Sequence, residues 1–332
     1  TKKQQLRDYL KSPLKAWRRL QENDNDKKRD FFYQEVERSA AGGEFDVALT
    51  GSDRSLHTLA SLKAKGHPFK LVYWIPFTIP FVDMFDPRSL AIRQAAFPHV
   101  DLFVAITDTC RHVLLLEGIP EEKIVHVYPG VDTEVFQPRP QPKQDDVFRI
   151  LFVGKLVSWK GCYTLLYAAK ELLPEIPNLE LTFVGQGAQR QGLEQAAELL
   201  GIKNRVKFTG FLKYDALPDI YAQSDAFVLP ALPAINLAEQ FGFVVAEAMA
   251  CGLPTVVSRV GGLPEVVGER DELIFTPGDF HELAARLRAI HGSRELAAEL
   301  GLHCLTHARA HYDAYKNGLA LKAVLEKMEQ GA

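Results

Sequence analysis

Short apolar runs alternate with longer segments of helical periodicity along most of the chain. The apolar runs are residues 45–50, 69–74, 102–106, 124–128, 149–153, 179–184, 206–208, 226–229 and 255–258. Runs of this length, bounded by turn residues, are typical of buried strands. The segments with helical spacing are residues 53–65, 88–97, 108–118, 161–173, 189–200, 215–222, 243–251 and 280–290. This alternation predicts an α/β fold with parallel sheets that carry helices on both faces.

A proline-rich stretch interrupts the alternation. Residues 137–147 carry three prolines at every second position among polar residues, which predicts an extended, semi-rigid linker. Helical periodicity fills the end of the chain from residue 293, with a break near Tyr312. The predicted parts are a Rossmann-like domain over 1–140, a linker over 141–148, a second Rossmann-like domain over 149–312 and a terminal helix over 313–332.

Composition and charge narrow the function classes. With 332 residues, 47% of them hydrophobic and 24% charged, the chain is long enough for two globular domains. The formal net charge of −3 provides no overall attraction to nucleic acid, so we expect no nucleic-acid partner. The four cysteines lack CxxC spacing, which argues against a disulfide framework or a zinc site and favours the cytoplasm. No apolar run reaches the roughly 18 residues of a membrane span.

The first twenty residues predict a basic amphipathic helix. Leucines and aromatic residues recur there at helical spacing, and seven Lys and Arg residues surround them. Such a helix can lie in a membrane interface with its cations near anionic headgroups, or it can pack on the domain through its leucine stripe. We therefore expect a cytoplasmic protein, with peripheral contact at the inner membrane face through residues 1–20 as the open alternative.

The densest candidate chemistry lies between residues 238 and 267. Glu239 and Glu247 are eight residues apart, and Gly242 and Gly252 are typical of a helix start and end. The segment between these glycines is apolar on all sides and must be buried, so the carboxylate of Glu247 needs a hydrogen-bond donor. At about 1.5 Å per residue, eight helical residues span roughly 12 Å, comparable with the distance from sugar to ribose in a nucleotide diphosphate sugar.

An anion site is predicted between the two carboxylates. Free N–H groups near Gly242, Phe243 and Val244 would lie at the positive end of the helix dipole. The stretch then offers contacts to a sugar, a phosphate and a ribose in sequence order. The structural alternative makes Glu239 an N-terminal cap and places Glu247 in a salt bridge.

Two lysines and two glycine turns are further candidates. Lys155 and Lys160 follow a strand and the turn at Gly154, and their spacing lets both reach one diphosphate. Two solvated surface lysines are the alternative. Gly185 and Gly187 follow the next strand and would let a ligand approach the backbone closely, although a plain turn has the same pattern.

Residues 239–254, Glu-Gln-Phe-Gly-Phe-Val-Val-Ala-Glu-Ala-Met-Ala-Cys-Gly-Leu-Pro, resemble the E-x7-E signature of the family four retaining glycosyltransferases, which have the GT-B fold. Residues 260–267, Val-Gly-Gly-Leu-Pro-Glu-Val-Val, resemble the loop and helix that follow in that family. The resemblance implies two Rossmann-like domains that face a cleft. No strand with a Gly-rich loop precedes Phe31, as one would in that family, so against the resemblance the first domain looks shortened: either the chain is a truncated form or the acceptor domain is reduced. A terminal helix, here 315–328, would cross back to the first domain.

The resemblance also implies roles for single residues. Glu239 would hold hydroxyls of the transferred sugar and stabilise the transition state, while Lys155 and Lys160 would neutralise the diphosphate leaving group. Glu247 would bind the ribose. The donor-binding residues implied are Gly154, Gly185, Gly187, Phe211, Leu212, Phe241, Gly242, Phe243, Val244 and Glu247. No metal and no other cofactor is expected.

Two departures from the family pattern concern the lysine loop and the first domain. Lys155 stands where Arg is usual, which keeps the charge but gives up the bidentate fork. The strand at 69–74 is followed by Ile-Pro-Phe-Thr, with no His where family members often have one. The aromatic cluster at 73–77 either takes an apolar or sugar acceptor or belongs to the core.

The leading hypothesis is a metal-independent retaining glycosyltransferase that moves a sugar from a UDP- or GDP-linked donor to an unidentified acceptor. The acceptor would be a saccharide, a lipid-linked saccharide or a small molecule. The alternatives are a non-catalytic or impaired sugar-nucleotide binding protein of the same fold, and a nucleotide-sugar epimerase.

Three histidines repeat on one face of the C-terminal helical region. His303, His307 and His311 are four residues apart, which places them on one helical face. They could hold a metal only with a further ligand and a buried cavity, so the interpretation is an exposed, His-rich helix face.

Overall fold

The computed structural model describes most of the chain. The described residues are 38–39, 42–43, 45–75, 77–82, 87–139, 146–235 and 237–329. The basic helix predicted over residues 1–20 and most of the linker predicted over 141–148 lie outside them. The chain forms two compact units, Thr1–Val72 with Ala91–Asp101, and Tyr73–Leu90 with Leu102–Ala332. The domain boundaries inferred from the sequence stay predictions.

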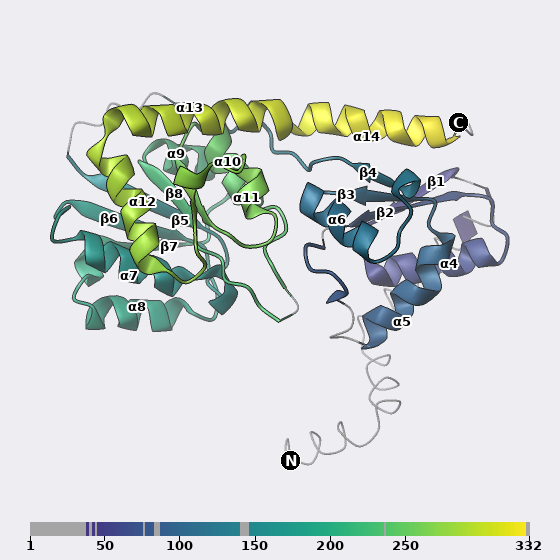
Figure 1. The fold of residues 1–332 in the computed structure, drawn as a ribbon, viewed down its shortest axis with the longest axis horizontal. Coiled ribbons are helices and arrows are strands. Elements are labelled where there is room, and N and C mark those ends of the chain that lie inside the picture. The colour runs from purple at the N-terminus through teal and green to yellow at the C-terminus, as the bar shows by residue number, and fades with distance from the viewer. Residues whose placement is uncertain are drawn as a thin grey trace, which may run out of the picture. The chain divides into compact units, whose positions relative to one another are not determined.

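In the part of the chain that the structure describes, four strands form the first sheet, in the order β1-β2-β3-β4 (Figure 1). They are β1 (Val47–Thr50), β2 (Lys70–Ile75), β3 (Leu102–Ala105) and β4 (Ile124–His126). The helices between them are α4 (Asp53–Ala64), α5 (Pro87–Ala96) and α6 (Asp108–Leu116), with short 3₁₀ turns at Phe97–His99 and Glu121–Lys123. β3 and β4 pair in parallel. β2 and β3 are buried along most of their length, which explains why both appear as continuous apolar runs in the sequence.

Six strands form the second sheet, in the order β10-β9-β8-β5-β6-β7, and every neighbouring pair is parallel. They are β5 (Phe148–Val153), β6 (Leu179–Val184), β7 (Val206–Gly210), β8 (Ala226–Leu229), β9 (Thr255–Ser258) and β10 (Ile274–Phe275). The strand order reverses between β5 and β8, because β6 and β7 lie on one side of β5 and β8 to β10 on the other. Ligands of open α/β sheets bind outside the carboxyl ends of the strands at such a reversal.

Eight α-helices and four 3₁₀ turns accompany the second sheet in the described part of the chain. The α-helices are α7 (Cys162–Leu172), α8 (Arg190–Leu199), α9 (Leu217–Ala222), α10 (Phe243–Ala250), α11 (Leu263–Val266), α12 (Phe280–Gly292), α13 (Arg294–His311) and α14 (Ala314–Glu329). The 3₁₀ turns are Ser158–Lys160, Lys203–Arg205, Tyr214–Ala216 and Asp271–Leu273. None of the helices that the structure describes could reach across a bilayer as an apolar span.

Two helical predictions are confirmed. α10 is buried from Val245 to Ala250 and packs on β8, β9 and α13, as its all-round apolar sequence requires. α13 runs on into α14 with a break at Tyr312, and Figure 1 shows the two helices end to end. The two-residue strand β10 was not predicted, because two residues are too few to show a period.

Gly161 shows how closely chain segments approach at the carboxyl edge of the second sheet. Its φ is 68°, and a Cβ there would lie 1.7 Å from the carbonyl oxygen of Pro230, directly after β8. Nearby, the N–H of Leu232 donates to the carbonyl of Trp159 at 2.7 Å. A side chain at Gly161 therefore does not fit unless the backbone moves. The glycine holds the 3₁₀ turn after β5 against the end of β8.

Gly161→Ala and Gly201→Ala form a matched pair, because both glycines have a φ of 68° and a Cβ on Gly201 would meet nothing within 4 Å. We expect Gly201→Ala to lower the free energy of unfolding by about 1–2 kcal/mol, the cost of the left-handed conformation. Gly161→Ala should lower it by about 3 kcal/mol more, because a clash in a packed core adds to the strain. Urea unfolding followed by circular dichroism measures both values, and equal losses would contradict the close approach.

Candidate functional site

The carboxyl ends of β5, β6 and β7 bring three glycine turns together. Gly154 follows β5 and donates its N–H to Val184 at 2.9 Å, and Gly185 follows β6 and donates to Gly210 at 2.8 Å. A Cβ on Gly185 would lie 1.9 Å from the carbonyl oxygen of Gly154, and one on Gly187 would also meet backbone. The predicted donor-binding glycines therefore line one sheet edge, where backbone packs directly on backbone.

Lys160 and Glu239, two of the predicted catalytic residues, form an ion pair. Each side chain is only 11% exposed. The ammonium of Lys160 also lies over the ring of Trp159, 4.5 Å from its centroid. Lys160 ends the 3₁₀ turn after β5, and Glu239 lies in the segment after β8, so the pair joins the two strands at which the sheet order reverses.

Glu239 lies in a loop before α10. The helix begins at Phe243, and its N-cap is Gly242 in the left-handed conformation, without a side-chain cap. The estimate of about 12 Å from helical rise therefore does not apply to Glu239 and Glu247, because the first half of that stretch is not helical. The alternative in which Glu239 caps the helix is also wrong.

The first amides of α10 are available to a ligand. The N–H groups of Gly242, Phe243 and Val244 donate to no residue that the structure describes. The side chain of Phe243 is half-exposed, whereas Phe241 is buried against the ring of Tyr312. Unpaired N–H groups at a helix start attract anions. The predicted anion site therefore has its donors in place.

Glu247 is buried in α10, with 6% of its surface exposed. The Tyr221 hydroxyl donates to its Oε2 at 2.9 Å. Burial raises the pKa of Glu247 to about 7, against the opposite effect of this hydrogen bond. Among the described residues no cation pairs with Glu247, so the salt-bridge alternative is wrong. The donor that a buried carboxyl needs is supplied by a phenol.

Lys155, Phe211 and Leu212 lie at the surface of the same edge. Lys155 is exposed and makes no ion pair with any described residue, so the two predicted lysines have different surroundings. Phe211 follows β7 and is 72% exposed, and Leu212 is half-buried against the core. An exposed aromatic ring at a strand end can stack on a base.

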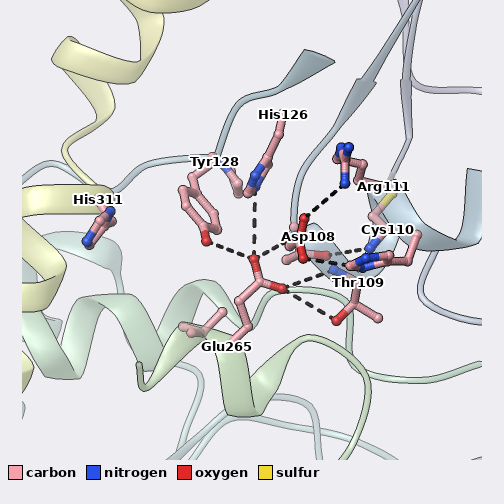
Figure 2. A network of polar contacts seen from close by, with 12 residues as sticks. Asp108, Thr109, Cys110, Arg111, His126, Tyr128, Glu265 and His311 are labelled. Atoms are coloured by element: carbon pink, nitrogen blue, oxygen red, sulfur yellow. Dashed lines mark hydrogen bonds and ion pairs between the residues drawn. The ribbon is translucent and has the colours of Figure 1, made fainter. Parts of the chain in front are cut away.

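Sequence reasoning missed the contacts of Glu265. Its carboxylate accepts hydrogen bonds from the backbone N–H of Asp108 and of Thr109 and from the Tyr128 hydroxyl (Figure 2). Glu265 belongs to the quoted motif at 260–267, but its partners lie more than 130 residues earlier. The aromatic cluster at 73–77 is partly core, since Tyr73 is buried.

The rings of the three histidines in α13 lie next to one another. Ring centroids are 5.8 Å apart for His303 and His307 and 4.5 Å apart for His307 and His311. Burial and the two neighbouring rings lower the pKa of His307 to about 4. The interpretation as an exposed face is wrong for His303 and His307, which are half-buried. No group of metal-ligating side chains large enough to hold an ion occurs in the part of the chain that the structure describes.

Comparison with known proteins assigns the chain to a family. The family described as "Glycosyl transferases group 1" matches residues 134–302, about half of the chain. An uncharacterized glycosyltransferase of Methanocaldococcus jannaschii is 37% identical over 159 residues, which are 45% of this chain and 39% of that protein. The GDP-mannose-dependent alpha-(1-6)-phosphatidylinositol monomannoside mannosyltransferase of Mycolicibacterium smegmatis is 34% identical over 158 residues, 45% of this chain and 41% of that protein. The chain thus spans less than half the length of these relatives.

A solved structure shares the fold. HepE of Anabaena, crystallised in complex with UDP, superposes with a TM-score of 0.79 at 23% identity, over 89% of this chain and 82% of that chain. This likeness and the two parallel sheets confirm the predicted α/β architecture of the GT-B class. The chain belongs to the group 1 glycosyl transferases.

Proposed function

We propose that this chain is a metal-independent retaining glycosyltransferase that takes its sugar from a UDP- or GDP-linked donor and passes it to an unidentified acceptor. The observation that carries the proposal is the buried Lys160–Glu239 pair next to the unpaired amides that open α10. The names of similar proteins agree with a nucleotide sugar, since the Mycolicibacterium relative is GDP-mannose-dependent and HepE was crystallised with UDP.

The diphosphate of the donor would bind at Lys160 and the first amides of α10. When the bond between the sugar carbon and the phosphate oxygen breaks, negative charge develops on the diphosphate. Lys160, with Lys155 from the exposed loop, would stabilise this charge together with the N–H groups of Gly242 to Val244. Bound phosphate oxygens would replace Glu239 as the partner of Lys160. The carboxylate would then be available to the sugar hydroxyls.

The acceptor would attack on the face from which the diphosphate leaves. Its hydroxyl oxygen forms the new bond to the sugar carbon, and its proton passes to an oxygen of the departing phosphate. Glu239 would stabilise the positive charge that develops on the sugar ring. Glu247, held by Tyr221, would accept hydrogen bonds from the ribose hydroxyls.

A panel of nucleotide sugars identifies the base. UDP-glucose and GDP-mannose, each with its free nucleoside diphosphate, are added in a thermal unfolding experiment. We expect the nucleotides that carry one of the two bases to raise the melting temperature, because a ligand at 100 times its dissociation constant adds about 2.7 kcal/mol to the free energy of unfolding. Glu247→Ala should abolish the increase. No increase with any member would contradict donor binding, and binding without turnover on any acceptor would favour a binding protein.

Glu239→Gln and Lys160→Met should have opposite effects on nucleotide affinity. Glu239→Gln releases Lys160 from its ion pair, so a nucleoside diphosphate should bind at least as tightly while kcat for transfer falls about 100-fold. Lys160→Met should weaken the nucleoside diphosphate by about tenfold or more, because a charge-assisted hydrogen bond contributes about 1.5–3 kcal/mol.

Titration calorimetry and initial rates measure the two quantities for both variants. Lys170→Met, an exposed lysine in the last turn of α7, is the matched control and should change neither. A wild-type kcat in the Glu239→Gln variant would contradict the proposed role of this carboxylate in transfer.

The protonation of Glu247 should make nucleotide affinity depend on pH. The ribose hydroxyls bind the charged carboxylate better, and its pKa of about 7 means that acid removes this acceptor. We expect affinity to fall about tenfold from pH 8 to pH 6, beyond any change of the nucleotide itself. Glu247→Gln cannot titrate and should show only the nucleotide's own dependence. Parallel pH profiles for the two proteins would contradict the ribose contact.

The same pKa has a consequence for stability. It lies above the ordinary value of 4.5, so the folded protein binds this proton more tightly than the unfolded chain does. The contribution of Glu247 to the free energy of unfolding therefore decreases as the pH rises from about 4.5 to about 7.

A further inference from the structure

The carboxylate of Glu265 accepts four hydrogen bonds, and the proposed function gives this residue no role. Its Oε1 accepts from the N–H of Asp108 at 2.7 Å and from the Tyr128 hydroxyl at 2.8 Å. Its Oε2 accepts from the N–H of Thr109 at 3.2 Å and from the Thr109 hydroxyl at 3.4 Å. Figure 2 shows the side chain extending from the short helix α11 to the start of α6.

These contacts use the positive end of a helix. Asp108 and Thr109 are the first residues of α6, and Thr107 caps the helix by accepting from Cys110. The charge of Glu265 therefore satisfies amides that have no partner within their helix. The Glu265 side chain is 13% exposed, so little water can compete with the protein donors for its carboxylate. An anion at this helix start is thus already supplied by the protein.

Two side chains next to Glu265 have shifted pKa values. Burial, and then Glu265 itself, raise the pKa of Tyr128 far above neutrality, so its hydroxyl stays a donor. Burial lowers the pKa of His126, whose Nε2 lies 3.9 Å from Glu265 Oε1. The carboxylate of Asp108 contacts Arg111 and His112.

The turn before α11 connects Glu265 to Glu239. Gly262 donates its N–H to the carbonyl of Glu239 at 3.0 Å. A Cβ on Gly261 would lie 1.9 Å from that carbonyl oxygen, and a Cβ on Gly262 would lie 2.2 Å from the carbonyl oxygen of Gln240. α11 begins at the next residue, so Glu265 lies three residues after Gly262. The backbone of Glu239 rests directly on this turn.

The other side of the turn is enclosed as well. The Thr78 hydroxyl lies 3.1 Å from the Cβ position of Gly261, and the Thr107 methyl lies 3.0 Å from that of Gly262. Thr107 immediately precedes the helix that Glu265 anchors. The turn is therefore held between the segment of Glu239 and the start of α6, and Glu265 fixes its C-terminal end.

We infer that Glu265 is a positioning residue for Glu239. By tying α11 to the start of α6, it fixes the Gly261–Gly262 turn and, through the Gly262 hydrogen bond, the backbone that carries the Glu239 carboxylate. This inference rests on the proposed function for the role of Glu239 in transfer. The positioning itself does not depend on that role.

Glu265→Gln tests the inference, because an amide nitrogen cannot accept a hydrogen bond and the variant has no charge for the helix start. We expect kcat to fall by about 10- to 100-fold, the effect of a small displacement of a reacting group. The affinity for the nucleoside diphosphate found in the panel should stay within about twofold, because the phosphate site is built by Lys160 and α10. Hydrogen exchange at the Gly262 amide should become faster.

Two further variants complete the experiment. Tyr128→Phe removes one of the donors and should produce a smaller loss of kcat in the same direction, and it decides the question if Glu265→Gln does not fold. Glu269→Gln, an exposed carboxylate just after α11, is the matched control and should leave rate, affinity and exchange unchanged.

Three results would overturn the inference. They are a wild-type kcat in both network variants, unchanged exchange at Gly262, and a parallel loss of kcat and nucleotide affinity, which would indicate a general role in stability. A wild-type chain that is inactive with every donor would count against the proposed function alone, since the exchange measurement does not need turnover.

Discussion

The site depends on the ion pair between Lys160 and Glu239, whose side chains are almost completely buried. Burying either charge away from solvent costs several kcal/mol of desolvation free energy, and the electrostatic attraction between the two groups offsets this cost. The indole of Trp159 adds a second favourable contact to the ammonium. The pair therefore places an ammonium group at the carboxyl edge of the sheet, next to amides that have no partner among the described residues. A diphosphate is the ligand that we propose for this edge, because free amides at a helix start attract anions.

The glycines around this pair allow backbone segments to pack in direct contact, which holds the two charged residues in place. Gly161 brings the lysine turn against the end of β8, and the Gly261–Gly262 turn supports the backbone of Glu239. Both charged groups are thus held by backbone contacts that leave no room for a Cβ. Rigid support of this kind limits the reorganisation that a bound donor would have to drive.

The helix α10 shows how one short element can serve both the core and the site. Its buried face packs on β8, β9 and α13, while the N–H groups of Gly242, Phe243 and Val244 at its start have no partner among the residues that the structure describes. Glu247 is the one ionisable group in this helix, and burial raises its pKa to about 7. A further hydrogen-bond donor at this carboxyl would therefore lower its pKa, as the Tyr221 hydroxyl already does.

The sequence predicts the central strands best. β8 and β9 have the predicted bounds and are buried throughout, as expected for strands covered on both faces. β6 also has its predicted bounds, although polar Glu180 and Thr182 alternate with apolar residues in it. The edge strand β7 extends two residues beyond its prediction, where polar residues alternate with apolar ones.

Long-range pairing was beyond sequence reasoning. The motif identified Lys160 and Glu239 separately, but residues 79 positions apart gave no sign that they pair. Two of the donors to Glu265 are backbone amides, which no residue type in the sequence reveals.

A crystal structure with the bound nucleoside diphosphate tests the central claim most directly. The account predicts a phosphate oxygen within about 3 Å of Lys160 Nζ and another within reach of the Phe243 or Val244 amide, with Glu239 no longer paired to Lys160. A diphosphate bound elsewhere, with the Lys160–Glu239 pair intact, would contradict it.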